Sequence, residues 1–267
     1  MPSIKKILFP VDFSQRAVGA ARYIESIAGR FEAEIMLLHV VDLATHVSMA
    51  TRVQPSRQEQ LESFLPRDLR QFVTRTVSTV GDPAEEIVKM VRSWAPDLVM
   101  MPSYGLGFFR PSLLGSVTAK VLHDIGCPVW TSVHAEDALP LERVGYTKVL
   151  CAIDLGERSR QIFEWARSFA GEYQSELGIM HAPPLVEAPP LVAEARGRIA
   201  ALLSAAGANA TVLVNGGEPV KAVACAAKEF HADLLIIGRH SGSGDEGYLR
   251  HHAYGIIRES PCPVISI

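Results

Sequence analysis

The sequence predicts an α/β protein made of two tandem, doubly wound, Rossmann-like domains, each built on a five-stranded parallel sheet. Short apolar runs that suit buried strands alternate along the chain with segments of helical periodicity. The chain also repeats itself at a nearly constant offset, which indicates two copies of one unit. The clearest repeated segments are Lys6–Asp12 with Lys148–Asp154, Gly81–Pro83 with Gly217–Pro219, and Cys127–Val129 with Cys262–Val264.

Five segments in the first copy are expected to be strands, four of them as short apolar runs and the third from a weak alternation of residues. They span residues 7–11, 35–41, 73–80, 98–101 and 129–133. The second copy presents the same order of elements. Because strand and helix alternate throughout, the strands of each copy should run parallel to one another.

Capping residues predict where the helices of the first copy begin and end. Ser14 can cap a helix that is expected to stop at Gly29. A second helix is expected over residues 61–72, where leucine and phenylalanine recur at helical spacing. The run Asp82–Glu85 holds the cap, the first-turn proline and the acid of a helix start. A last helix should begin at Ser116.

The repeat divides the chain into two predicted domains, residues 1–135 and residues 146–267. The segment 134–146 between them is polar and irregular, with Pro140 and Gly145, and is typical of a linker. A length of 267 residues is enough for two domains of ordinary size, each with its own core.

The overall composition is that of a globular protein, with 48% hydrophobic and 21% charged residues. A net charge of −3 without any basic block argues against a nucleic-acid-binding surface. No apolar run approaches the roughly 18 residues that span a bilayer, and no signal peptide is visible. The four cysteines form no C-x-x-C pair. We therefore expect a cytoplasmic protein that binds neither nucleic acid nor membrane.

The first copy carries an expected anion site after its fourth strand. Ligands of doubly wound sheets bind at the carboxyl ends of the strands, where the winding direction switches. There Gly105 is followed, after nine residues, by Gly115 and Ser116, which open a helix. Glycine allows a ligand to approach the backbone, and the amides of a helix start favour an anion. Asp12, at the end of the neighbouring strand, could hold a ribose hydroxyl, an adenine amino group or a divalent cation.

Both halves of the chain resemble the universal stress protein family. Gly105, Gly115 and Ser116 match the family's nucleotide signature of G-x-x-G, nine residues, and G-S or G-T, with Pro102 as the departure. Pro10–Ser14, Leu38–Val40 and Cys127–Val129 also resemble family motifs. The resemblance implies a fold similar to that of the adenine-nucleotide alpha-hydrolases. It also implies a regulatory protein of the stress response that binds ATP or AMP, with Asp12 as the residue that could hold a nucleotide-bound Mg²⁺.

The resemblance also implies which positions contact the nucleotide. By this resemblance, the positions at the ends of the first two strands surround the adenine and the ribose. The positions after the fourth strand surround the ribose and the phosphates. Together these positions are Pro10, Val11, Asp12, Val40, Met101, Pro102, Gly105, Gly115, Ser116, Val117 and Thr118. The proline at position 102 removes an amide donor and fixes φ, which would weaken binding if that position must donate to the ligand.

The second copy is expected to be degenerate for triphosphate binding. Gly238 is retained, but the Gly–Ser pair at the helix start aligns with Arg250 and His251. Asp154 matches Asp12 without these partners. The nearby histidines His240, His251 and His252 match no familiar metal-ligand spacing, and we interpret them as solvated loop residues.

Two other functions compete with nucleotide-dependent regulation. A slow ATPase would need a positioned water and charge stabilisation, but no base stands out in the sequence. A module that only folds and dimerises would bind no nucleotide at all. Isothermal titration with ATP separates the last function from the first, and phosphate release over hours separates the ATPase from both.

The last strands of the two copies, 129–133 and 264–267, are apolar edge strands. Such strands are usually covered or paired with another strand. The family resemblance implies pairing through this fifth strand. In a tandem chain the two copies can pair with each other, and a homodimer can form in addition. We predict the intrachain pairing.

Overall fold

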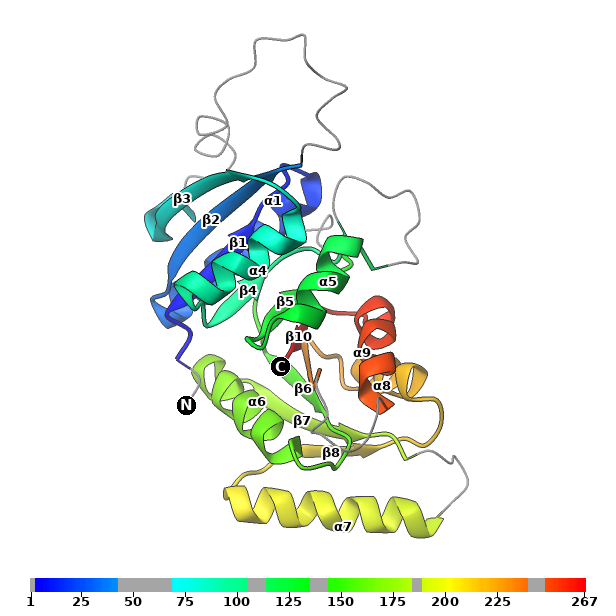
Figure 1. Ribbon diagram of the computed structural model, residues 1–267. Helices are drawn as coiled ribbons and strands as arrows, with labels where there is room; N and C mark the ends of the chain where they lie inside the picture. The colour runs from blue at the N-terminus through cyan, green and yellow to red at the C-terminus, as the bar shows by residue number, and fades with distance from the viewer. Residues whose placement is uncertain (1–2, 43–68, 105–113, 135–143, 184–188, 240–247) are drawn as a thin grey trace. The chain divides into compact units, whose positions relative to one another are not determined.

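The computed structural model describes residues 3–42, 69–104, 114–134, 144–183, 189–239 and 248–267 (Figure 1). These residues divide into two compact units. We call residues 3–144 the first domain and residues 145–267 the second domain.

The first domain is a parallel α/β sheet in which helices cover both faces. Its strands are β1 (Lys6–Pro10), β2 (Glu34–Val41), β3 (Val73–Val80), β4 (Leu98–Met100) and β5 (Val129–Thr131), in the spatial order β3-β2-β1-β4-β5. Its helices are α1 (Gln15–Phe31), α4 (Pro83–Trp94) and α5 (Ser116–Asp124), with a 3₁₀ turn, η1 (Leu69–Phe72), before β3. Figure 1 shows α4 and α5 on one face of the sheet and α1 on the other.

The second domain repeats this topology. Its strands are β6 (Lys148–Ala152), β7 (Glu176–His181), β8 (Thr211–Val214), β9 (Leu234–Ile237) and β10 (Val264–Ser266), in the order β10-β9-β6-β7-β8. Its helices are α6 (Ser159–Tyr173), α7 (Pro189–Ala206), α8 (Pro219–Glu229) and α9 (Tyr248–Glu259). All strand pairs within each domain are parallel, so the predicted fold class is confirmed.

Helix α1 begins as predicted but continues past Gly29. Ser14 accepts a hydrogen bond from the amide of Ala17 and caps the helix start. The expected stop at Gly29 is wrong, because the helix runs to Phe31 and ends at Glu32 in the left-handed conformation (φ 52°). Phe31 is only 7% exposed, so the extra turn buries an aromatic ring that a stop at Gly29 would leave in solvent.

Three other predictions can be compared with the described residues. The strand expected over residues 73–80 is observed as β3 with the same bounds. Most of the helix expected over 61–72 lies outside the described residues, and its end forms the 3₁₀ turn η1. Tyr146, placed in the linker, is 2% exposed and packs edge-on against Phe169 and Tyr173 of α6. It therefore belongs to the core of the second domain.

The two cores differ at one matched position in their second strands. Met36 of β2 is buried in the first domain, at 2% exposure. The matching residue in β7 is Gly178, where an added Cβ atom would lie 2.9 Å from Leu150 and 3.0 Å from the ring of Phe230. Leu150 and Phe230 therefore occupy the volume that a larger side chain at position 178 would need.

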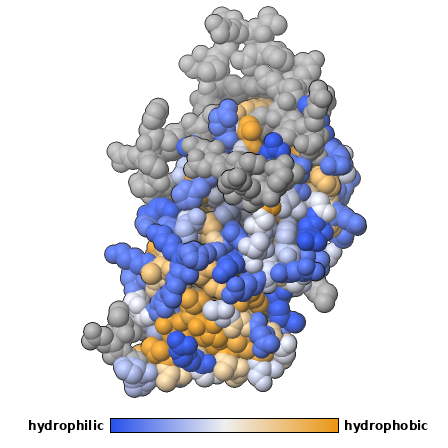
Figure 2. Space-filling view, turned by 180° about the vertical axis from the view of Figure 1, so that it is seen from behind, coloured by the Kyte–Doolittle hydropathy of each residue, from blue (hydrophilic) through white to orange (hydrophobic). Residues whose placement is uncertain are grey.

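Hydrophobic residues gather on the second domain at the lower end of the view in Figure 2. The helix α7 buries only Ala195 and Ile199, and Leu191 near its start is 36% exposed. Within the described part of the chain, no helix combines the length and the apolar character needed to cross a membrane.

Candidate functional site

The turn after β1 holds the carboxylate of Asp12 at the start of α1. The amide of Val11 donates to the carbonyl of Leu38 at 2.9 Å, which extends the β1–β2 ladder to the edge of the sheet. The amide of Ser14 then donates to Oδ1 of Asp12 at 3.0 Å. Since this bond fixes one carboxylate oxygen, Asp12 is held half-buried at the carboxyl edge of the sheet, where ligands of such sheets bind.

A histidine and a left-handed residue fix the shape of this turn. Phe13 has φ 60°, a conformation that costs a residue with a Cβ atom about 1–2 kcal/mol. Its ring packs on the imidazole of His39, with centroids 4.5 Å apart. Nδ1 of His39 lies 2.9 Å from the carbonyl oxygen of Val11. Because a carbonyl can only accept, Nδ1 carries the hydrogen and donates it. His39 therefore positions the turn that carries Asp12.

The same turn follows β6 in the second domain. Leu155 has φ 61°, and Nδ1 of His181 lies 2.9 Å from the carbonyl oxygen of Ile153. Oδ1 of Asp154 accepts from the amide of Gly156 at 2.8 Å and from the hydroxyl of Ser159 at 3.0 Å. The two domains thus share a carboxylate turn built from equivalent residues.

The loop after β4 shows how the proline at position 102 is accommodated. The amides of Met101 and Ser103 donate to the carbonyls of Trp130 and Ser132, both at 3.1 Å. Because amides alternate in direction along an extended chain, an amide at position 102 would point away from β5. The carbonyl of Pro102 accepts from the hydroxyl of Thr118 at 3.1 Å. The side chain of Thr118, 2% exposed, therefore ties α5 to this loop.

Gly115 lies where the backbone of α5 passes closest to the loop after β4. Its amide donates to the carbonyl of Ser103 at 2.8 Å. A Cβ atom at position 115 would lie 3.1 Å from the Cα atom of Tyr104 and 3.2 Å from the carbonyl oxygen of Ser103. Both are backbone atoms that cannot move aside independently, so a larger residue would have to shift the helix start or the loop by a few tenths of an ångström, and the close approach favours glycine.

The start of α5 has no side-chain cap. Gly115 is the cap residue and makes no side-chain hydrogen bond to the helix amides. Ser116 is exposed and Val117 is half-buried. By contrast, Asp82 accepts from the amide of Glu85 at 2.9 Å at the start of α4. The first-turn amides of α5 are therefore available, within the described residues, to an external anion.

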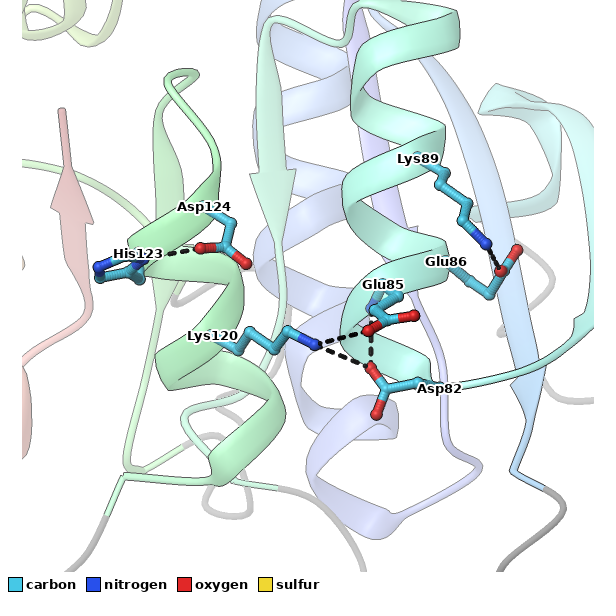
Figure 3. Close-up of polar contacts among 7 residues, drawn as sticks. All are labelled: Asp82, Glu85, Glu86, Lys89, Lys120, His123 and Asp124. Carbon is cyan, nitrogen blue, oxygen red and sulfur yellow. Dashed lines mark hydrogen bonds and ion pairs between the residues drawn. The ribbon is translucent and has the colours of Figure 1, made fainter.

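Lys120 of α5 pairs with two acidic residues at the start of α4. Figure 3 shows its side chain reaching from α5 to the start of α4. Nζ lies 3.2 Å from Oε1 of Glu85 and 3.5 Å from Oδ1 of Asp82. The hydrogen bond to Glu85 raises the pKa of Lys120, while the hydrogen bond from the amide of Glu85 lowers the pKa of Asp82. These exposed ion pairs join the starts of α4 and α5 and add little to stability.

Arg16 is a cation near the site that sequence reasoning missed. Its guanidinium lies 4.6 Å from the ring centroid of Tyr104, which follows β4. The hydroxyl of Tyr104 donates to the carbonyl of Val133 at 3.2 Å, which fixes the ring under the guanidinium. This places a positive charge from the first turn of α1 beside the loop after β4. The recurrence of arginine at position 158 of the second copy is the signal that could have found it.

The structure brings most of the predicted site residues to one edge. Pro10, Val11, Asp12 and Val40 lie at the ends of β1 and β2, Met101 and Pro102 follow β4, and Gly115, Ser116, Val117 and Thr118 begin α5. The strands β1, β2 and β4 are direct neighbours. Gly105 lies outside the described residues, as do His240 and the acids beside it. Among the described residues, no three His, Cys, Asp or Glu side chains form a metal cluster.

The corresponding edge of the second domain carries a different residue at the helix position that Gly115 occupies in the first. Arg250 aligns with Gly115 and is part of α9, whose described residues run from Tyr248 to Glu259. A cavity of about 250 Å³ lies beside Asp154, and sequence reasoning missed it. Its lining residues are Ala152, Ile153, Asp154, Met180, His181, Ala182, Pro219, Val223, Ile237 and Ile256.

Comparison with known families agrees with this duplicated architecture. The universal stress protein family model matches residues 3–132 and again residues 145–267. This chain belongs to the universal stress protein family. Two universal stress proteins of Methanocaldococcus jannaschii each match 47% of the chain. One is 28% identical over 149 residues, 92% of its own length, and the other is 30% identical over 135 residues, 79% of its length.

A solved structure shares the fold over the whole chain. A universal stress protein from Archaeoglobus fulgidus covers 99% of this chain with 96% of its own, at a TM-score of 0.73 and 23% identity. A universal stress protein from Pseudomonas aeruginosa covers 100% of the chain with 94% of its own, at a TM-score of 0.73 and 18% identity. The fold of the whole chain, with its two similar domains, is therefore found in other solved structures.

Proposed function

We propose that this universal stress protein is a regulatory protein of the stress response that binds ATP or AMP in its first domain. The observation that carries the proposal is the uncapped start of α5 behind Gly115, at the same edge of the sheet as the carboxylate of Asp12. Helix amides bind phosphate groups, and a carboxylate binds hydroxyl or amino groups. One edge therefore offers groups that match both ends of a nucleotide.

Different residues of the first domain would bind different parts of the nucleotide. The amides of Ser116 and Val117 would donate to phosphate oxygens, and Arg16 would add positive charge from the side of α1. Asp12 would bind the ribose or adenine end, and its oxygens also suit Mg²⁺ that accompanies a nucleotide. Bound Mg²⁺ would neutralise phosphate charge. Thr118 would act indirectly by holding the loop through the carbonyl of Pro102.

The test is isothermal titration of ATP and of AMP into the full chain, in Mg²⁺ and in EDTA. Gly115→Val should weaken binding at least about tenfold, or about 1.4 kcal/mol, because its side chain would push the start of α5 away from Tyr104. The matched control is Gly126→Ala, since a Cβ atom at position 126 meets nothing within 4 Å. The control should bind like the parent protein.

A second variant tests the opposite end of the nucleotide. Asp12→Asn keeps an oxygen that can accept from the amide of Ser14, so the turn should survive, but it removes the negative charge. We expect weaker binding and a smaller difference between Mg²⁺ and EDTA. The proposal fails if the parent protein binds neither nucleotide, or if Gly115→Val binds as tightly as Gly126→Ala.

A further inference from the structure

The first turn of α1 places a half-buried arginine at the carboxyl edge of the first-domain sheet. The turn is fixed by Ser14, whose hydroxyl accepts from the amide of Ala17 at 3.2 Å and whose carbonyl accepts from the amide of Val18 at 3.1 Å. Arg16 lies inside this turn, shortly after Asp12 in the chain. Its side chain therefore starts from a well-anchored backbone beside the carboxylate that would bind the ribose or adenine end of a nucleotide.

The ring of Tyr104 holds the guanidinium of Arg16 close to the start of α5. The guanidinium carbon lies 4.6 Å from the centroid of that ring. The ring is itself fixed, because Tyr104 is 8% exposed and its hydroxyl donates to the carbonyl of Val133 at 3.2 Å. The backbone of the same residue passes the start of α5, where a Cβ atom at Gly115 would lie 3.1 Å from the Cα atom of Tyr104. One residue thus lies against both the cation and the helix start that would bind phosphate.

Several other described cations of the first domain are engaged elsewhere. Lys120 pairs with the acids that begin α4, and Arg22 pairs with an acid of its own helix. Arg30 and Arg92 lie in the last turns of α1 and α4, toward the opposite edge of the sheet. Within the described part of this domain, Arg16 is therefore the cation best placed to meet phosphate groups beyond the one that α5 would bind.

The chemistry of these two groups favours a longer phosphate chain. A guanidinium that stacks on an aromatic ring keeps the N–H groups on its edge for hydrogen bonds, and these suit two phosphate oxygens at once. The amides of a helix start, by contrast, bind the phosphate group that lies next to them. AMP has one phosphate group for those amides. ATP has two more, which carry further negative charge and need donors beyond the helix.

We propose that Arg16 is the residue by which the first domain distinguishes a nucleoside triphosphate from a monophosphate. Its guanidinium binds the outer phosphate groups of ATP, while the amides of α5 bind the phosphate group that ATP and AMP share. Tyr104 is a positioning residue, since its ring keeps the guanidinium near the start of α5. The inference rests on the proposed function, because it names which nucleotide the same site prefers.

The test is isothermal titration of ATP and of AMP into the full chain at constant ionic strength. Arg16→Gln keeps much of the length of the side chain but removes its charge. It should weaken ATP at least about tenfold and AMP no more than about threefold, because charge-assisted hydrogen bonds to the outer phosphate groups are lost. Tyr104→Leu should lower the ratio of ATP to AMP affinity by a smaller factor, because the charge remains but loses its orientation. Circular dichroism checks that both variants fold.

The matched control is Arg30→Gln, which removes the same charge from the last turn of the same helix. This position lies about 21 Å along the helix axis from Arg16. The control should bind ATP and AMP like the parent protein. High salt should narrow the preference for ATP in the parent protein and in the control, and should narrow it less in Arg16→Gln, because salt screens interactions between charges.

The inference and the proposed function can fail separately. A parent protein that prefers ATP, together with an Arg16→Gln variant that loses most of this preference, would support the inference. Equal losses of ATP and AMP affinity would overturn it, because they would show that Arg16 only shapes the edge. An unchanged ATP affinity in Arg16→Gln, or a parent protein that binds AMP as tightly as ATP, would also overturn it. In these three cases the proposed function still stands. If the parent protein binds neither nucleotide, the proposed function fails and the inference fails with it.

Discussion

The two domains share the turn after their first strand but differ at the start of their last helix. In both, a histidine Nδ1–H holds the carbonyl before the aspartate, and a left-handed non-glycine residue follows it. At the other side of the edge, Gly115 opens α5 without a side-chain cap, whereas the matching residue of α9 is Arg250. The two domains therefore share the carboxylate turn but not the glycine of the helix.

This difference shows that the residues of the edge can change without a change of topology. The strand order and the parallel pairing are the same in both domains. A residue at a helix start can be exchanged while the strand ends that form the rest of the edge stay fixed.

The largest expected effect concerns the matched core position in the second strand. Met36→Ala should lower the free energy of unfolding by about 2–5 kcal/mol, because Met36 is buried and its removal leaves a cavity. Urea unfolding followed by circular dichroism measures the change. Leu191→Ala, at an exposed position of α7, is the control and should change it by less than about 0.5 kcal/mol. A loss below about 1 kcal/mol for Met36→Ala would contradict the packing described here.

The reverse change in the second domain should cost less but should still destabilise. Gly178→Met introduces the residue of the first domain where Leu150 and Phe230 already occupy the volume. Overpacking of this kind costs about 1–3 kcal/mol. Adding Phe230→Ala would make room, so the double variant should lose less stability than the two single losses added together. Strict additivity in urea unfolding would show that these side chains do not compete for space.

The caps of α4 and α8 offer a smaller comparison. Asp82→Ala should cost about 1 kcal/mol, and Glu218→Ala less, because aspartate is the better cap. Both carboxyls have a folded pKa below their ordinary values of 3.8 and 4.5. Their contribution is therefore complete above these values and is lost as the pH falls through the folded pKa. Unfolding at pH 7 and at pH 3 should show each variant's deficit at pH 7 shrinking in acid.

The smallest expected effect concerns Pro102. Its carbonyl accepts a hydrogen bond from the hydroxyl of Thr118, and an amide at this position would point away from β5. Pro102→Gly should therefore change ATP affinity less than about threefold, or about 0.65 kcal/mol. Thr118→Val, which removes the bond to the carbonyl, should weaken binding more. A much larger gain with Pro102→Gly would show that the missing amide limits the site.

The sequence predicted the elements whose signals are local. The start of α4 follows from Asp82 and Pro83, and β3 follows from its alternation of residues. The end of α1 was missed because burial of Phe31 outweighs the stop signal of Gly29. The left-handed residues Phe13 and Leu155 carry no sequence signal, since their conformation depends on a histidine supplied by the next strand.

The features of the site that escaped prediction depend on contacts between distant segments. Arg16 meets Tyr104 only after α1 and the loop beyond β4 are brought together. The cavity beside Asp154 needs side chains from two later helices, such as Val223 and Ile256. Sequence reasoning predicts a degenerate phosphate loop in the second copy, and it could not foresee the cavity beside Asp154.

The close approach at Gly115 has a consequence for engineering the chain. The amide of Gly115 bonds to the carbonyl of Ser103, while the strand order and the aspartate turn are common to both halves. An exchange of segments between the halves would have to carry this glycine along, because a Cβ atom at its position would lie 3.1 Å from the backbone of Tyr104.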